Sequence, residues 1–270
     1  MNLLEKKMVD ALIDLKENHH VLSIKAEFEA EGTRLEEAMR LKEVSDKAGL
    51  ELSIKIGGCE AIKDMYDARI IGVNTIIAPM IETPYALKKY VNASNFVFPQ
   101  DEKKDIKFLV NIETETGFSN LSSMIETKEF ESIDGIVLGR VDMAGSMNMS
   151  RDSLNSDKIL ELAKVMSLKM QKINKDMVIG GGISAQALPF LKQVPHLSRY
   201  ETRKIIFNAK PSLKDNKADI GILKAVGFEL MWLKNKRDFY GIIYKEDELR
   251  IEMLENRYKT LIEEAGGKYE

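Results

Sequence analysis

Two carboxylates and one amide stand where apolar runs of the chain end. The run 106–113 ends with Asn111 and Glu113, and the run 135–143 ends with Asp142. Alternate residues of a strand share a face, so Asn111 and Glu113 are expected on the same side. Oxygen ligands at neighbouring strand ends can hold Mg²⁺ or Mn²⁺. These residues alone also allow a purely structural role, because an Asp before a helix is commonly an N-cap and a Glu after a strand is commonly solvated.

Two lysines offer a different chemistry. Lys25 and Lys55 each lie inside an apolar run, at 21–29 and 50–58. A lysine that is desolvated near another cation can have a pKa low enough to attack a ketone and form a Schiff base. An aldolase of that kind would need no metal. Nearby carboxylates such as Glu27 explain the same lysines as ion pairs.

The elements that must position these side chains alternate between two periods. Short β-branched runs cover 21–29, 50–58, 74–80, 106–113, 135–143, 176–184 and 203–209. Most are followed by longer helical segments, such as 33–49 and 156–173. Repeated β-then-α units predict a parallel sheet. With a weaker eighth strand at 95–98, we expect an α/β fold of the TIM (β/α)8 barrel type over about residues 20–210.

The remainder of the chain, about 216–266, has a helical pattern. No Pro/Gly/Ser linker divides the sequence, so we expect a single domain over 1–270, a barrel with a helical C-terminal extension. Phe228, Trp232 and Ile243 give that extension more apolar surface than a terminal appendage needs. We expect it to pack on a neighbouring subunit, as in a homo-oligomer, or on its own barrel.

Composition narrows the class of partner. The 270 residues are 44% hydrophobic and 31% charged, with a formal net charge of −3, as in a soluble globular protein. Interspersed charges give no footprint for nucleic acid or an anionic membrane, and no stretch reaches the length of a membrane span. A small molecule is therefore the expected partner. The single cysteine, Cys59, excludes an internal disulfide framework and favours the cytoplasm.

Three stretches together resemble a known family. "SIDGIVLGRVDMAGSM" (132–147), "FLVNIET" (108–114) and "ARIIGVNTIIAPMIETPYAL" (68–87) look like the HpcH/HpaI aldolase and citrate lyase β-subunit family. The similarity covers roughly residues 20–210. It implies a metal-dependent TIM barrel that makes or breaks carbon–carbon bonds next to a carboxylate.

The resemblance also implies roles for single residues, and two positions depart from it. It makes Glu113 and Asp142 the ligands of a divalent metal, Mg²⁺ or Mn²⁺. Lys55 stands where the family has an arginine that bonds the keto oxygen, and lysine lacks the planar two-pronged geometry. Glu27 occupies the family's acidic position, where it would order water or a base, but Phe28 stands in the place of the family's histidine.

The turns after two strands supply the remaining candidates. Backbone N–H groups around Gly139, Val141 and Asp142 could cradle a substrate carboxylate. Arg140 could add positive charge there, or form a salt bridge at the barrel rim. Gly181 lies in a glycine run that could let the chain approach a ligand such as a phosphate, or could be only a tight turn.

Together these residues predict a divalent-metal-dependent carbon–carbon lyase or aldolase that acts on a 2-oxo acid through pyruvate enolate chemistry. The expected catalytic residues are Lys55, Glu27 and Arg140. The expected substrate-binding residues are Asn111, Gly139, Val141, Asp142 and Gly181, beside the metal ligands Glu113 and Asp142. Two alternatives remain: a Schiff-base aldolase that uses Lys55 or Lys25, and a non-catalytic barrel that binds a metabolite or forms part of a complex.

Overall fold

The strands close into a barrel, as predicted. The computed structural model describes residues 1–268, and its eight strands pair in chain order, β1 to β8, with β8 returning to β1. The strands are β1 (Val21–Glu27), β2 (Glu51–Lys55), β3 (Thr75–Ala78), β4 (Lys107–Asn111), β5 (Gly135–Gly139), β6 (Asp176–Gly180), β7 (Arg199–Glu201) and β8 (Ile205–Asn208). Their span agrees with the predicted barrel limits of about 20–210.

Two details of the sheet differ from the prediction. The run 95–98 is not a strand: it forms the end of helix α4 (Pro84–Val97), where Val97 and Phe98 are buried against the barrel. The missing strand is the short β7, which forms a hairpin with β8. Because of that hairpin, β8 is antiparallel to both β7 and β1, whereas the other neighbouring pairs are parallel.

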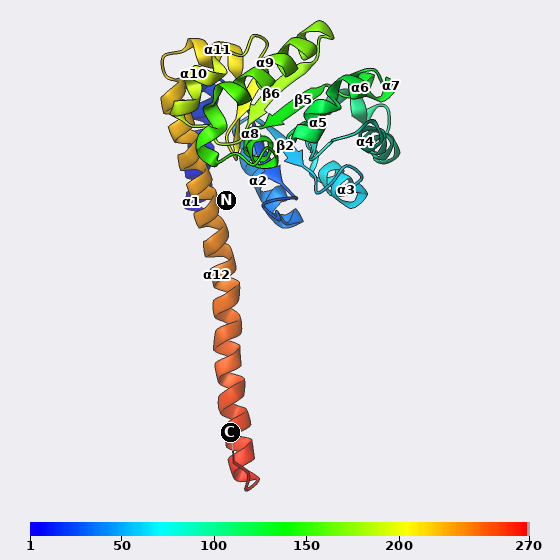
Figure 1. The fold of residues 1–270 in the computed structure, drawn as a ribbon. Coiled ribbons are helices and arrows are strands. Elements are labelled where there is room, and N and C mark those ends of the chain that lie inside the picture. The colour runs from blue at the N-terminus through cyan, green and yellow to red at the C-terminus, as the bar shows by residue number, and fades with distance from the viewer. Residues whose placement is uncertain (269–270) are drawn as a thin grey trace. The chain divides into compact units, whose positions relative to one another are not determined.

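Helices follow most strands and lie outside the barrel (Figure 1). They are α1 (Leu3–His19), α2 (Leu35–Lys47), α3 (Ile62–Ile71), α4 (Pro84–Val97), α5 (Glu115–Ser119), α6 (Leu121–Ile125), α7 (Lys128–Glu131), α8 (Arg140–Ser146), α9 (Asp157–Lys172), α10 (Leu188–Leu191), α11 (Ala209–Lys214) and α12 (Ala218–Glu264), with 3₁₀ turns at Glu102–Asp105, Arg151–Asn155 and Ala185–Ala187. The helix α1 begins at a capping box in which Asn2 and Glu5 satisfy each other's backbone N–H.

The barrel interior has an apolar layer, and on β4 it changes to a polar residue within one pleat repeat. Ile77, Leu109, Val137 and Val178 form a buried cluster contributed by β3 to β6. Two residues further along each strand the next inward side chain stands nearer the carboxyl end. On β4 that residue is Asn111. On β4 the polar Asn111 therefore lies directly above the apolar layer.

The chain divides into two compact units, one ending at Glu229 and the other starting at Leu230. The first holds the barrel, its helices and the beginning of α12, in which Phe228 is fully buried. The second holds the remainder of α12. Among residues 1–268, none of the helices combines the length and apolar character that a bilayer crossing requires.

Candidate active site at the barrel mouth

A cavity of about 390 Å³ opens at the end of the barrel where the parallel strands have their carboxyl ends, with Val137 of the apolar layer among its lining residues. Every residue predicted for the site except Arg140 lines it: Glu27, Lys55, Asn111, Glu113, Gly139, Val141, Asp142 and Gly181. The functional end of a TIM barrel is the end at which these residues meet. The cavity is therefore the candidate active site.

Glu113 is the most enclosed carboxylate of the predicted metal pair, with 2% of its surface exposed. Its Oε2 accepts a 2.8 Å hydrogen bond from Asn111 Nδ2, and its Oε1 accepts a 3.2 Å bond from the backbone N–H of Met80. Met80 has a left-handed backbone (φ 48°), which is uncommon outside glycine. Burial raises the pKa of Glu113, and the nearby charge of Asp142 acts in the same direction.

A glycine makes room for this carboxylate. Gly139 ends β5, and a Cβ atom placed there would lie 2.4 Å from Glu113 Oε2. The same residue is the N-cap of α8, so Asp142 lies in the first helical turn and is not itself the cap. Asp142 is exposed at the rim of the cavity, whereas Glu113 is buried beneath it. The charges of the two carboxylates therefore interact although Glu113 lies inside the cavity and Asp142 lies at its rim.

The oxygen atoms at this site fit a hard cation whose remaining ligands are water molecules or substrate oxygens. Residues 1–268 contain no group of three or more His, Cys, Asp or Glu side chains that could hold a metal. Two carboxylates are sufficient for Mg²⁺ or Mn²⁺, since such ions retain several waters. The buried Oδ1 of Asn111 accepts no hydrogen bond from the described residues and is an oxygen of the kind that such ions bind.

Charge supports the same conclusion. Four cationic side chains line the cavity, Lys25, Lys55, Arg151 and Arg203. Six carboxylates line it as well, Glu27, Glu29, Glu113, Asp142, Glu201 and Glu229. The formal balance is −2, which one divalent ion would neutralise.

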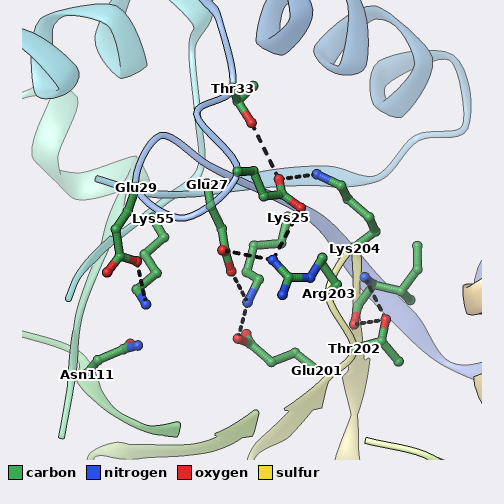
Figure 2. Close-up of polar contacts among 12 residues, drawn as sticks. Lys25, Glu27, Glu29, Thr33, Lys55, Asn111, Glu201, Thr202, Arg203 and Lys204 are labelled. Carbon is green, nitrogen blue, oxygen red and sulfur yellow. Dashed lines mark hydrogen bonds and ion pairs between the residues drawn. The ribbon is translucent and has the colours of Figure 1, made fainter. Parts of the chain in front are cut away.

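Each of the two lysines is held between two carboxylates, and Figure 2 shows Lys25 between Glu27 and Glu201. Lys25 Nζ lies 3.1 Å from Glu27 Oε1 and 2.5 Å from Glu201 Oε1. Lys55 Nζ lies 2.7 Å from Glu29 Oε2 and 3.4 Å from Glu113 Oε1. The two lysines therefore sit in separate ion-pair clusters.

The ion pairs decide the charge state of these lysines. Burial alone would lower the pKa of Lys25, but Glu201 and Glu27 outweigh it and raise the pKa. The pKa of Lys55 is raised in the same way, by Glu113 and Glu29 against burial. Both ammonium groups are consequently charged near neutral pH. A Schiff base requires a neutral amine, so this geometry disfavours the lysine-nucleophile alternative.

Glu27 is a weak candidate for a base. Burial by itself raises its pKa, but the charge and hydrogen bond of Lys25 prevail, and the pKa is lowered. Its two oxygens lie 3.1 Å from Lys25 Nζ and 3.6 Å from a terminal nitrogen of Arg203. Glu27 thus serves the ion-pair cluster in this arrangement.

The placement of Arg140 corrects the prediction that it adds charge to the mouth. Arg140 is fully buried and does not line the cavity. Its guanidinium donates to Asn155 Oδ1 at 2.7 Å and to the backbone oxygen of Gly181 at 2.7 Å, and it lies 4.8 Å from the ring centre of Phe190. The reason is the strand period: Val137 and Gly139 face inward, so residue 140 leaves on the outer side.

The glycine run 180–182, at the end of β6, lines the cavity and also allows neighbouring elements to pack closely. A Cβ on Gly181 (φ 80°) would lie 2.8 Å from the backbone nitrogen of Val141, so only glycine permits this approach to α8. A Cβ on Gly180 would lie 3.0 Å from Glu201 Oε1. The run therefore brings three elements together around the mouth.

Sequence reasoning missed the contribution of the β7–β8 hairpin. Glu201, Thr202 and Arg203 line the cavity, and Figure 2 shows the ion pair of Glu201 with Lys25. The segment "RYETRK" lacks the length and apolar content of the other strands. The available signal was alternation, since Tyr200 packs outward on Phe207 while Glu201 points inward.

Comparison with known proteins agrees with this architecture. Residues 26–175 match the family described as HpcH/HpaI aldolase/citrate lyase. A family protein from Burkholderia cenocepacia J2315 is 14% identical with a TM-score of 0.59, covering 75% of this chain and 93% of that one. The citrate synthase SbnG is also 14% identical with a TM-score of 0.58, covering 86% and 90%.

Likeness at this identity shows the fold alone. A search of curated proteins gives no match. The family match spans more than half of the chain and includes both Glu113 and Asp142. The chain belongs to the HpcH/HpaI aldolase/citrate lyase family.

Proposed function

We propose that the protein is a carbon–carbon lyase that acts on a 2-oxo acid such as pyruvate or its adducts with the help of Mg²⁺ or Mn²⁺. One observation supports this most strongly. Glu113, Asp142 and the unpaired Asn111 Oδ1 meet at the mouth of a barrel whose family is of the aldolase and citrate lyase type. Lys55 stands beside them, 3.4 Å from Glu113.

The division of work follows from the contacts. The metal, when held by Glu113 and Asp142, would stabilise negative charge on the oxygens of the 2-oxo acid. Lys55 donates to the oxygen on which charge develops during cleavage, in place of the family's arginine. The backbone N–H groups of Val141 and Asp142, in the first turn of α8, receive the substrate carboxylate.

Proton exchange of pyruvate tests this function without knowledge of the second substrate. In D₂O with Mn²⁺ or Mg²⁺, the protein is expected to exchange the methyl protons of pyruvate, followed by NMR. EDTA and the variant Glu113→Gln should each abolish the exchange. Exchange that survives EDTA and that borohydride converts into a lysine adduct would instead support the Schiff-base alternative. Neither exchange nor thermal stabilisation by pyruvate with metal would support the non-catalytic barrel.

We also propose that the protein works in the cytoplasm as a homo-oligomer, which its long terminal helix can hold together. Residues 230–261 of α12 carry exposed apolar side chains at seven of the ten a and d positions of a heptad repeat; Arg237, Tyr240 and Asp247 occupy the other three. The seven are Leu230, Leu233, Tyr244, Ile251, Leu254, Tyr258 and Leu261. In a parallel pair with a second copy, Arg250 at position g meets Glu255 at position e of the partner helix.

Solution mass tests the self-association. Light scattering is expected to give a multiple of the chain mass of 30.6 kDa. Leu254→Asp, within the heptad stripe, should yield the single-chain mass. Leu249→Asp is the matched control, because Leu249 is also exposed but lies on the opposite helix face. Equal effects of the two variants, or a wild type of 30.6 kDa, would contradict the proposal.

A further inference from the structure

We infer that Glu29 is the positioning residue of Lys55, an inference that rests on the proposed function and deepens it. Glu29 holds the Lys55 ammonium in the orientation from which it donates to the substrate oxygen. The two side chains together then replace the single arginine that the family has in the place of Lys55. Glu29 is not among the residues to which the family resemblance assigns a role.

A lysine in this position depends on its neighbours more than an arginine does. The guanidinium of arginine is planar and presents its N–H donors in a rigid fork, so two parallel bonds to one carboxylate fix its direction. The ammonium of lysine is a point charge on a flexible four-carbon stem, and its donors rotate. The direction of Lys55 is therefore set by the carboxylates placed around it.

Two carboxylates contact Lys55, and Glu29 is the nearer. Its Oε2 lies 2.7 Å from Lys55 Nζ, whereas Glu113 Oε1 lies 3.4 Å away. Figure 2 shows the contact between Glu29 and Lys55, with Asn111 beside them. The Lys55 side chain is 9% exposed, and the Glu29 oxygen that faces it is buried. Solvent and salt weaken a pair in such surroundings only slightly.

Glu113 is the poorer anchor because it has other tasks. Its Oε1 already accepts the backbone N–H of Met80 at 3.2 Å. Under the proposed function Glu113 is also a metal ligand, and a carboxylate that binds a cation has less charge left for Lys55. An ammonium has three donors, so the contacts with Glu29 and Glu113 leave one for a substrate oxygen. Glu29 is therefore the carboxylate that holds Lys55 while the site is in use.

The turn after β1 fixes the place of Glu29. The backbone N–H of Phe28 donates to Lys55 O at 2.8 Å, which joins the ends of β1 and β2. The backbone N–H of Gly32 donates to Glu29 O at 3.2 Å, and Gly32 has the left-handed backbone (φ 55°) that glycine adopts without strain. Glu29 is thus tied to the strand that carries Lys55 and to the end of its own turn.

Exchange of the methyl protons of pyruvate in D₂O, at saturating Mn²⁺, measures this role in the full chain. Glu29→Gln keeps the size of the side chain and removes its charge. We expect kcat to fall by at least about 10-fold while KM changes by less than about 3-fold, because a misplaced oxyanion donor costs most in the transition state. Saturating Mn²⁺ removes any contribution from a weaker affinity for the metal.

A double-variant cycle distinguishes positioning of Lys55 from a general effect on the site. The guanidinium introduced by Lys55→Arg carries its own planar geometry, so it depends less on the charge at position 29. Adding Glu29→Gln to Lys55→Arg should therefore change kcat by less than about 3-fold. A purely structural role of Glu29 would give the same loss with either residue at position 55.

Glu31→Gln is the matched control for the turn itself. Glu31 lies in the same turn, but it pairs with Lys204 and lies outside the cavity lining. It should change kcat by less than about 3-fold. The melting temperature of each variant shows separately whether the protein is folded at the temperature of the assay.

Each contrary result has a distinct meaning. Equal losses from Glu29→Gln in the wild type and in Lys55→Arg would contradict the inference, and so would an equal loss in Glu31→Gln. A Glu29→Gln rate that is unchanged or higher would also contradict it, since Glu29 would then be dispensable or would compete with substrate for Lys55. These results leave the proposed function intact. A wild type that exchanges no protons with Mn²⁺ overturns the proposed function together with the inference.

Discussion

Gly139→Ala should weaken metal binding without disturbing the fold. Gly139 has φ −82° and ψ 94°, which alanine adopts without strain. Its new Cβ would lie 2.4 Å from Glu113 Oε2, so this oxygen must move by about 1 Å to reach the ordinary contact distance of 3.4 Å. Because the same oxygen accepts the 2.8 Å hydrogen bond from Asn111, the movement would break or weaken that bond. The ligand would lose its orientation while the cavity otherwise remains.

The expected loss of Mn²⁺ affinity can be taken from residues that position a metal ligand without binding the metal themselves. Their loss typically weakens affinity by about 10–100-fold, or about 1.4–2.7 kcal/mol. Calorimetric titration with Mn²⁺ measures this directly. Gly145→Ala is the matched control, since Gly145 lies in the same helix α8 and a Cβ there meets nothing within 4 Å. Equal Mn²⁺ affinity in Gly139→Ala and wild type, with both folded, would refute the reasoning.

Three further predictions concern single side chains. Lys55→Met should lower the rate of pyruvate proton exchange by about 10²–10³-fold, as expected for loss of an oxyanion donor, and Lys55→Arg should recover part of it; equal rates in all three proteins would contradict this role. Arg140→Met should lower the free energy of unfolding in urea by about 3 kcal/mol, because the backbone oxygens of Leu154, Gly181 and Gly182 and Oδ1 of Asn155 lose this donor, while activity per folded molecule stays within about 3-fold. Burial, and then Lys224, lower the pKa of His19 below the unfolded value of about 6.5, so stability present above that pH should be lost as the pH falls through the folded-state pKa. His19→Gln should flatten this fall in melting temperature between about pH 7 and 5, and an unchanged slope would show that other groups cause it.

The barrel could be predicted because its strands are mostly apolar runs with helices between them. The strand β4 also shows why part of the site was predictable: the period of two places Asn111 and Glu113 on one face, and the structure joins them by a hydrogen bond. The same period on β5 turns Arg140 outward, against the prediction. The sequence pattern was thus informative wherever a strand was long enough to show which of its residues face the barrel interior.

The remaining parts of the site depend on contacts that local pattern does not reveal. Lys25 and Glu201 are 176 residues apart, and their pairing follows from closure of the barrel through a three-residue strand. Such a short strand has little pattern of its own. The pKa directions of both lysines follow from these distant carboxylates, so the charge states could be assigned only once the fold was known.

The central claim is that Glu113 and Asp142 hold one divalent cation within reach of a 2-oxo acid. Titration of Mn²⁺ into wild type, Glu113→Gln and Asp142→Asn, with and without pyruvate, tests it most directly. We expect one ion per chain in wild type and tighter binding with pyruvate. In each variant the Mn²⁺ affinity should fall by more than about 100-fold, the upper end of what loss of a residue that supports a metal ligand causes. Mn²⁺ affinity that is the same in all three proteins, or that pyruvate does not change, would contradict it.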